Sequence, residues 1–249
     1  MVKKLFILFI VFGFSQFSFG QTFFGAHFNP GLAGALVKAT NAYGTNNVNE
    51  HNDSIQNIQE HLFAPAFGLH VSQRLKRFDE LYIGLRYQVY GWQRKRTDLL
   101  FPDSLHTDIG KIQAIQPAGD MEYYYRFHNI SIPIYYFKTI KWDKMPTGMN
   151  IGFYGGGSLN VVVSKKAKAK SIGFTAYNKR EFDLPSEKFE MLPVTISIEG
   201  GVRMRQALGD DYYFSFTPGL SFIPIPSSNS YERQFQYKIQ VGLGVSKAF

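Results

Sequence analysis

The side chains able to perform acid–base or nucleophilic chemistry gather in two polar stretches of this sequence. His51, Asp53, Ser54 and His61 lie in or beside the first stretch, and His106 lies in the second. A hydroxyl, a histidine and a carboxylate that converge in space can act as a nucleophile, its base and a group that orients the base. The spacing fixes no such geometry, so His51, Asp53 and His61 are candidates without a predicted catalytic site.

Metal and thiol chemistry have little support in the composition. The sequence contains no cysteine, which excludes disulfides, thiolate ligands and cysteine nucleophiles. His27 and His70 are expected to face the interior from adjacent strands, but two histidines without a third ligand make a poor metal site. We therefore expect no bound metal and no other cofactor.

Four charged residues are expected inside the fold, where ionised groups must pair or stay hydrated: Arg86, Glu199, Arg203 and Lys238. Arg203 lies four residues beyond Glu199 on the same expected strand, too far for easy contact at about 3.3 Å per residue. Glu199 is therefore expected to pair with a cation from another strand. Such a network would fill the interior and stabilise the fold, and a proton or ion path is the alternative.

Basic residues form two further clusters in segments expected to be outer loops: Arg94, Lys95 and Arg96, and Lys165, Lys166, Lys168 and Lys170. If these loops lie at the outer rim of a membrane protein, their cations could hold the phosphates of lipopolysaccharide through charge-assisted contacts. The alternative is a pair of solvated loops. The net charge is +8, but no continuous basic stripe with interleaved aromatic residues occurs, so nucleic acid is not an expected partner.

The elements that must position these side chains follow a period of two. In the last segment, Phe235, Tyr237, Ile239, Val241, Leu243 and Val245 share one face, and small or polar residues share the other. This alternation is typical of strands with different environments on their faces. The same pattern predicts strands near residues 24–36, 63–71, 81–90, 129–136, 151–163, 194–204, 212–222 and 235–249. Pro133 cannot donate to a ladder, so an irregularity is expected there.

The predicted connections alternate in length. Segments 38–60, 95–121 and 165–187 are long and polar, whereas the turns near Arg77, Lys144 and Gly209 and the last outer loop, 226–232, are short. Outer-membrane barrels show short turns on the periplasmic side and longer loops outside. The polar face carries Gly, Ser, Asn, Gln and Tyr rather than the Lys and Glu of a soluble surface. Residues 21–249 are therefore predicted to form an all-β, eight-stranded antiparallel up-and-down transmembrane β-barrel.

The first residues have the features of a secretory signal peptide. Lys3 and Lys4 precede an apolar run over residues 5–14, and Ser18 and Gly20 stand where a signal peptidase reads small residues. The run is shorter than the roughly 20 residues that a spanning helix needs. We expect residues 1–20 to be a signal peptide, and the remainder to reach the outer membrane through the periplasm.

A family resemblance rests on this leader, on the segment HNISIPIYYF over residues 128–137, and on the alternating last strand that ends in Phe249. With these features the chain resembles the PorT-like outer-membrane β-barrel families of Bacteroidota. The resemblance implies fold and location, and only some members are tied to protein secretion. The last strand looks like the signal that barrel-assembly machinery reads. Asp53-Ser54-Ile55 and Asp103-Ser104-Leu105 look like the phylum's O-glycosylation pattern, which makes Ser54 and Ser104 glycosylation candidates.

These features favour a non-enzymatic integral outer-membrane protein with a structural or interaction role. The resemblance adds an accessory role in protein secretion or envelope assembly as one form of that role. Outer-membrane lipid and lipopolysaccharide are the expected partners. Two alternatives stay open: a lipid-modifying enzyme that acts at the outer rim, and a barrel that binds a small ligand or forms a narrow pore.

Overall fold

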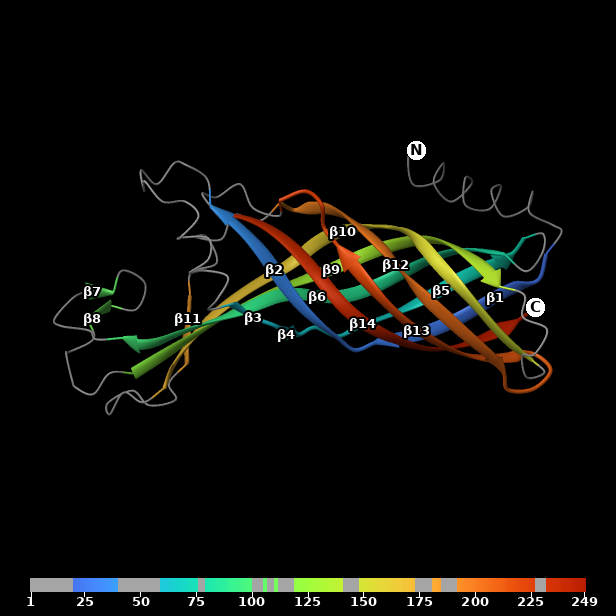
Figure 1. Cartoon of the computed structure of the whole chain (residues 1–249), viewed down its shortest axis with the longest axis horizontal. Coiled ribbons are helices and arrows are strands. Elements are labelled where there is room, and N and C mark those ends of the chain that lie inside the picture. Colours follow the sequence, from blue (N-terminus) through green and yellow to red (C-terminus); the bar gives the residue numbers. More distant parts are fainter. Residues whose placement is uncertain are drawn as a thin grey trace, which may run out of the picture.

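The computed structural model describes residues 20–39, 59–75, 79–99, 105–106, 110–111, 119–140, 148–172, 181–184, 192–226 and 232–249 (Figure 1). Residues 1–19 of the predicted signal peptide (residues 1–20) lie outside these ranges, as do Ser54 and Ser104. The described residues are all-β. A small sheet of β7 (Leu105–His106) and β8 (Gly110–Lys111) stands beside one large antiparallel sheet. Among the described residues, no helix is long and apolar enough to cross a membrane.

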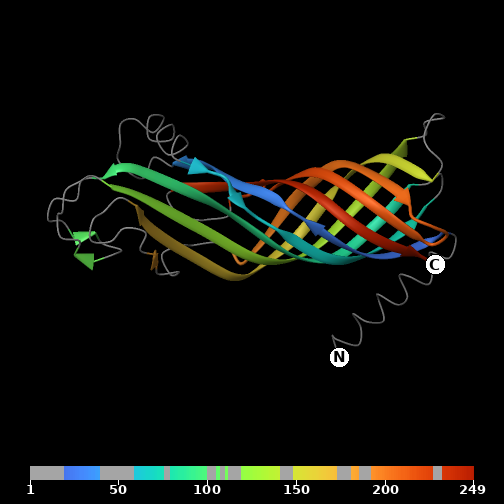
Figure 2. The ribbon, with the colours of Figure 1, turned by 90° about the horizontal axis from the view of Figure 1, so that it is seen from below.

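The large sheet closes on itself. Its path runs through β1 (Thr22–Asn29), β5 (Ala66–Arg74), β6 (Glu80–Leu99), β9 (Gly119–Ile140), β10 (Met149–Ile172), β12 (Val194–Ala207), β13 (Tyr212–Phe222) and β14 (Glu232–Ala248). Strand β1 pairs with β5 on one side and with β14 on the other. The result is an elongated barrel of strongly tilted strands (Figure 2). Closure matters in a bilayer because an open edge would leave backbone groups without partners.

The sheet has twelve hydrogen-bonded strands, whereas the sequence predicted eight. The additional strands are β2 (Gly31–Ala39), β3 (Gln59–Glu60), β4 (Leu62–Phe63) and β11 (Glu181–Asp183). Pro30 separates β1 from β2, and both strands pair with β14. Strands β3 and β4 continue the wall between β2 and β6 in two short pieces. Short pieces of this kind carry too few residues to show a period of their own.

The two faces of the barrel wall are those that the period-two pattern predicted. On β14, the side chain of Lys238 is completely buried, whereas its neighbour Ile239 is 49% exposed. Other strands show the same alternation, with large apolar side chains outward and polar ones inward. Exposed apolar residues include Leu85, Ile134, Phe153, Val163, Ile198 and Leu220. An apolar outer surface and a polar interior are what a membrane-spanning barrel requires.

Strands β6, β9 and β10 are longer than predicted, at 20, 22 and 24 residues. The prediction of loops over 95–121 and 165–187 is therefore wrong in part, because β6, β9 and β10 extend into these segments. Strand β10 continues because Ala167 and Ala169 alternate with lysines and are buried together with Met121 and Tyr123. A spanning strand needs only about 9–11 residues. The three strands consequently reach well beyond the others at the end opposite the chain's C-terminus (Figure 1).

Pro133 causes the expected local irregularity in β9. The pairing of β6 with β9 is interrupted between the pairs Ile83–Ile134 and Arg86–Ser131. On its other side, Pro133 stays in register with Ser158 of β10. The ladder is thus interrupted on the β6 side of a residue that has no N–H to donate.

Candidate functional site

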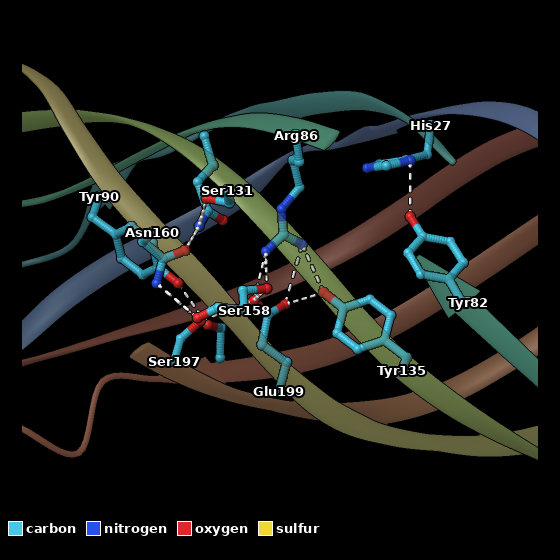
Figure 3. A network of polar contacts seen from close by, with 12 residues as sticks. His27, Tyr82, Arg86, Tyr90, Ser131, Tyr135, Ser158, Asn160, Ser197 and Glu199 are labelled. Carbon is cyan, nitrogen blue, oxygen red and sulfur yellow. Dashed lines mark hydrogen bonds and ion pairs between the residues drawn. The ribbon is translucent and has the colours of Figure 1, made fainter. Parts of the chain in front are cut away.

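An ion pair between Arg86 and Glu199 occupies the middle of the lumen (Figure 3). The guanidinium of Arg86 on β6 donates to both carboxylate oxygens of Glu199 on β12, at 2.5 and 3.1 Å. Both side chains are at most 2% exposed. The structure thus brings together two of the residues that the sequence placed inside the barrel, and Glu199 pairs across the lumen rather than along its own strand.

Hydroxyl groups complete the partners of this ion pair. Tyr135 donates to Glu199 at 2.6 Å and accepts from Arg86 at 3.0 Å. Ser158 has the same double role, donating at 2.6 Å and accepting at 3.2 Å. Ser197 donates to the carboxylate at 3.1 Å. Buried ionic groups are tolerated when their remaining hydrogen-bonding capacity is met in this way.

A neutral hydrogen-bonded layer lies next to the ion pair, toward the extended end of the barrel. Gln88 donates to Ser131 at 2.6 Å and to Asn160 at 2.7 Å. Asn160 in turn donates to Ser197 at 3.2 Å, which links this layer to Glu199. The network therefore crosses the lumen through strands β6, β9, β10 and β12 (Figure 3). The interiors of small barrels are typically filled by side chains in this manner.

A second ionic cluster lies toward the end that holds the chain's C-terminus. Glu80 accepts from Arg203 at 2.9 Å and from Arg205 at 2.5 Å, and all three side chains are buried. The guanidinium of Arg203 also lies 3.6 Å from the ring centroid of Phe137. Arg205 is held in the same way over Phe23, at 4.4 Å. Stacking on aromatic rings favours arginine over lysine at such positions.

Lys238, the remaining lumen candidate, is fully buried on β14. Its ammonium has no hydrogen-bond partner among the described residues. The ring centroid of Tyr90 lies 6.0 Å from this ammonium nitrogen. Tyr90 itself is hydrogen-bonded to Ser221 at 2.6 Å. Lys238 therefore places an amino group in the lumen without joining either ionic cluster directly.

His27 and His70 lie inside the barrel on the neighbouring strands β1 and β5, with ring centroids 5.7 Å apart. Tyr82 stacks on His70 and contacts the Nδ1 atom of His27 at 3.3 Å. No group of three or more histidines or carboxylates that could hold a metal occurs in the described part of the chain. The two histidines belong instead to an aromatic cluster beside the ionic groups.

Three of the lysines predicted as lipopolysaccharide contacts form a groove on the outer face of β9 and β10. Lys166, Lys168 and Lys170 line it together with Tyr124, Arg126 and Glu181. The groove has a volume of about 360 Å³. These lysines lie in a strand rather than in the predicted loop, because the alternating alanines bury the other face of β10. The strand holds the three lysines on one side at a spacing of two residues.

The other basic candidates are separated from this groove. Arg94, Lys95 and Arg96 lie on β6, and β9 stands between β6 and β10 in the sheet. Lys95 forms a half-exposed ion pair with Asp120 at 3.2 Å. Lys165 is in register with the buried Phe127. The two predicted clusters therefore lie on two strands, β6 and β10, that are not neighbours in the sheet.

Electrostatic contacts within the groove shift the protonation of its members. Lys168 donates to Glu181 at 3.0 Å, which raises the pKa of Lys168 and lowers the pKa of Glu181. Burial, together with a hydrogen bond to Glu122, raises the pKa of Tyr124 to about 12. The lysine and the tyrosine therefore keep their protons at neutral pH. The hydroxyl of Tyr124 donates to Glu122, whereas the ammonium of Lys168 has further N–H groups that can donate to an anion.

Of the three catalytic candidates, His61 alone lies among the described residues. His51 and Asp53 lie outside the described residues. His61 is exposed, and its Nε2 atom lies 2.8 Å from the hydroxyl of Tyr237 on β14. The ring of Tyr237 passes directly over Gly34 of β2, where a Cβ atom would lie 2.6 Å from the hydroxyl oxygen. The histidine thus takes part in a contact across the outside of the wall.

Several residues at these sites were missed in the sequence. Glu80 and Arg205 have the same strand parity as Arg86 and Arg203, so the period-two pattern could have assigned them to the lumen. Arg126 has the parity of Ile130 and belongs to the outer face. Each was overlooked because the predicted strands ended too early. The partners themselves could not be read, since they come from strands far apart in the sequence.

Known proteins resemble this chain to different extents. No curated protein sequence matches the chain. The structure is similar to Neisserial surface protein A (NspA), with 11% identity and a TM-score of 0.41 over 91% of this chain and 97% of that chain. It is also similar to OprG from Pseudomonas aeruginosa, with 12% identity and a TM-score of 0.32 over 92% and 96%. Likeness at this level carries no information on function.

The match to a protein family is more extensive. Residues 14–223 match the model described as "Outer membrane protein beta-barrel domain". This range covers most of the chain and most of the strands that close the barrel. It agrees with the apolar outer face and the polar lumen. The chain is therefore located in the outer membrane and belongs to the outer membrane protein beta-barrel domain family.

Proposed function

We propose that this chain is a non-enzymatic barrel that crosses the outer membrane eight times and binds lipopolysaccharide phosphates at its outer rim, in a structural or interaction role. The observation that carries the proposal is the cationic groove on β9 and β10. Its position and charge support lipopolysaccharide as the ligand, and the side chains that fill most of the lumen argue against a transport role. An accessory role in secretion or envelope assembly is one form of this function.

The eight crossings follow from the way β1 and β2 share a partner. Strand β14 pairs with β1 from Phe23 to Phe28 and with β2 from Gly31 to Ala39. The two strands are thus consecutive parts of one wall element, interrupted at Pro30. Strands β3, β4 and β11 contain only two or three residues each, too few to cross a membrane.

The groove begins where the apolar outer surface ends. On β10, Val161 and Val163 are exposed apolar residues, and Lys166 follows after a bulge. On β9, Ile130 is exposed at the level of Val161, and Arg126 lies beside Lys166. The change from apolar to cationic side chains marks the level of the lipid headgroups. Phosphates of the outer leaflet lie at this depth.

The groove matches a phosphate in charge and in donor geometry. Arg126 and three lysines supply N–H donors, and charge-assisted contacts of this type are stronger than neutral ones. Glu181 is the opposing group, because its carboxylate occupies Lys168 at 3.0 Å. A bound phosphate would compete with Glu181 for this lysine. The affinity should therefore depend on both the lysines and the carboxylate.

The test compares binding of lipid A that carries both phosphates with binding of dephosphorylated lipid A to the purified, folded chain. We expect the triple variant Lys166→Gln, Lys168→Gln and Lys170→Gln to bind the phosphorylated lipid at least about tenfold more weakly. Glu181→Gln should strengthen binding, because it frees Lys168. Dephosphorylated lipid A should bind all of these proteins equally.

A matched control removes lysines from the opposite end of the barrel. The double variant Lys138→Gln and Lys247→Gln lowers the positive charge without touching the groove. Its affinity for phosphorylated lipid A should equal that of the unmodified chain. Equal loss in the control and in the groove variant would indicate a general charge effect and would refute the proposal.

The remaining expectations form part of the same proposal. Residues 1–20 act as a signal peptide, and Ser54 and Ser104 are glycosylation sites on outer loops. Barrel-assembly machinery recognises the last strand, which ends in Phe249, and the chain is PorT-like. His61 contacts Tyr237 rather than a carboxylate, which favours a non-enzymatic role over a lipid-modifying one. Cleavage after Gly20, read by N-terminal sequencing of the membrane form, tests the first of these expectations.

A further inference from the structure

We propose that the lumen holds a small monovalent anion of the size of chloride in a cavity between His70, Arg203 and Arg205. This site is separate from the groove on the outer face, and it does not depend on lipopolysaccharide binding. The inference rests on an imbalance of charge, on the lining of the cavity and on buried nitrogen atoms without partners.

The charge imbalance lies in the cluster around Glu80. Arg203 and Arg205 share this single carboxylate, at 2.9 and 2.5 Å, so the three groups together carry one positive charge. The next ion pair, Arg86 with Glu199, is neutral as a unit and offers no spare carboxylate. Water stabilises such a charge only in part when the surroundings have a low dielectric constant. An anion nearby would offset the charge directly.

A cavity adjoins this cluster. Its volume is about 50 Å³, whereas a single water molecule needs only about 10–15 Å³ of such volume. Arg86, Arg203 and Arg205 line it, and none of its lining residues is an aspartate or a glutamate. The space accepts a halide ion with one or two waters. It is too small for a sugar or a nucleotide.

Polar atoms without partners point to a ligand in the same place. The Nε2 atom of His27 and the Nδ1 atom of His70 are buried and have no hydrogen-bond partner in the structure, and both residues line the cavity. His70 is only 7% exposed. The Nε atom of Arg205 is unpartnered as well. The amide oxygens of Asn29 and Gln240 line the cavity without partners too, so the anion is assigned to the side of the cavity that the guanidinium groups line. Nitrogen donors there and the lack of a lining carboxylate favour an anion over a cation.

The experiment uses crystals of the full chain grown in sodium bromide and records anomalous scattering from bromide. We expect an anomalous peak in the cavity, within contact distance of Arg203 or Arg205. In parallel, the temperature of unfolding is measured as sodium bromide replaces sodium gluconate at constant ionic strength. We expect the midpoint to rise with bromide and to saturate.

Two variants with opposite effects sharpen the test. Arg203→Gln leaves one arginine for Glu80, so the bromide-dependent shift should disappear. Glu80→Gln removes a negative charge and so raises the net charge of the cluster by one. The bromide concentration at half-saturation should therefore fall at least about tenfold. Lys247→Gln removes a cation outside the lumen and should leave the bromide dependence unchanged.

The absence of a bromide peak in the cavity of the unmodified chain would overturn the proposal, as would identical midpoints in bromide and gluconate. The unmodified chain alone decides this, even if a variant fails to fold. A shift that Arg203→Gln retains in full would show that bromide acts elsewhere, and it would also count against the site.

Discussion

Replacing Glu199 by glutamine should destabilise the barrel more than most single substitutions would. The change keeps the shape of the side chain and removes its charge, which leaves the guanidinium of Arg86 buried without a counter-ion. Arg86 is 2% exposed, so solvent cannot replace the lost carboxylate. Tyr135 and Ser158 would still donate to the neutral glutamine side chain. Neither residue carries a negative charge that could replace that of the carboxylate.

The size of the effect follows from the burial of the pair. Breaking a buried ion pair by removing one partner costs about 3–5 kcal/mol. We expect a loss of this size for Glu199→Gln, and a similar loss for Arg86→Met. The double variant leaves no buried charge at this position. It should therefore lose less than the sum of the single losses, by about 2 kcal/mol or more.

The assay is urea unfolding of the chain folded into lipid vesicles, followed by tryptophan fluorescence, to which the buried Trp92 contributes, and by the gel mobility of unboiled samples. Glu181→Gln is the matched control, because its ion pair with Lys168 is about half exposed on both sides. The control should unfold at the same urea concentration as the unmodified chain. A loss below about 1 kcal/mol for Glu199→Gln, or additive losses in the double variant, would refute the reasoning.

Three further outcomes follow from the wall and the lumen. Leu220→Arg places a charge on the lipid-facing side, where Leu220 is 60% exposed, and should cost about 2–4 kcal/mol in the same unfolding assay. Gly91→Ala would bring a Cβ atom to 2.0 Å from the carbonyl oxygen of Tyr125 and should cost about 1–3 kcal/mol, whereas Gly209→Ala meets no atom within 4 Å and should be neutral. In planar bilayers the chain should show no steady ion conductance, and sustained channel openings would contradict the filled lumen.

The strands could be predicted from the sequence because one rule, the alternation of side chains between the two faces, governs them. In β14, Ile239 and Lys238 differ in exposure as the alternation predicts, since neighbouring side chains of a strand point to opposite faces. The ends of the strands were harder to predict from the sequence. The segment around Lys168 reads as a basic loop by composition, yet Ala167 and Ala169 continue the alternation and become buried against β9. Small apolar residues carry a weak signal, so their partners decide whether the strand continues.

The membrane location, the all-β architecture and the inward direction of Arg86, Glu199, Arg203 and Lys238 could be predicted from the sequence, because these depend on neighbouring residues and on a period of two. The pairing of the charges depends on the folded barrel. Arg86 and Glu199 are 113 residues apart, and their pairing depends on the register of the strands that lie between them in the wall. The same holds for Glu80 with Arg203 and for the lysines that join Arg126. A one-residue slip in any intervening strand would turn its side chains to the other face and change these partners.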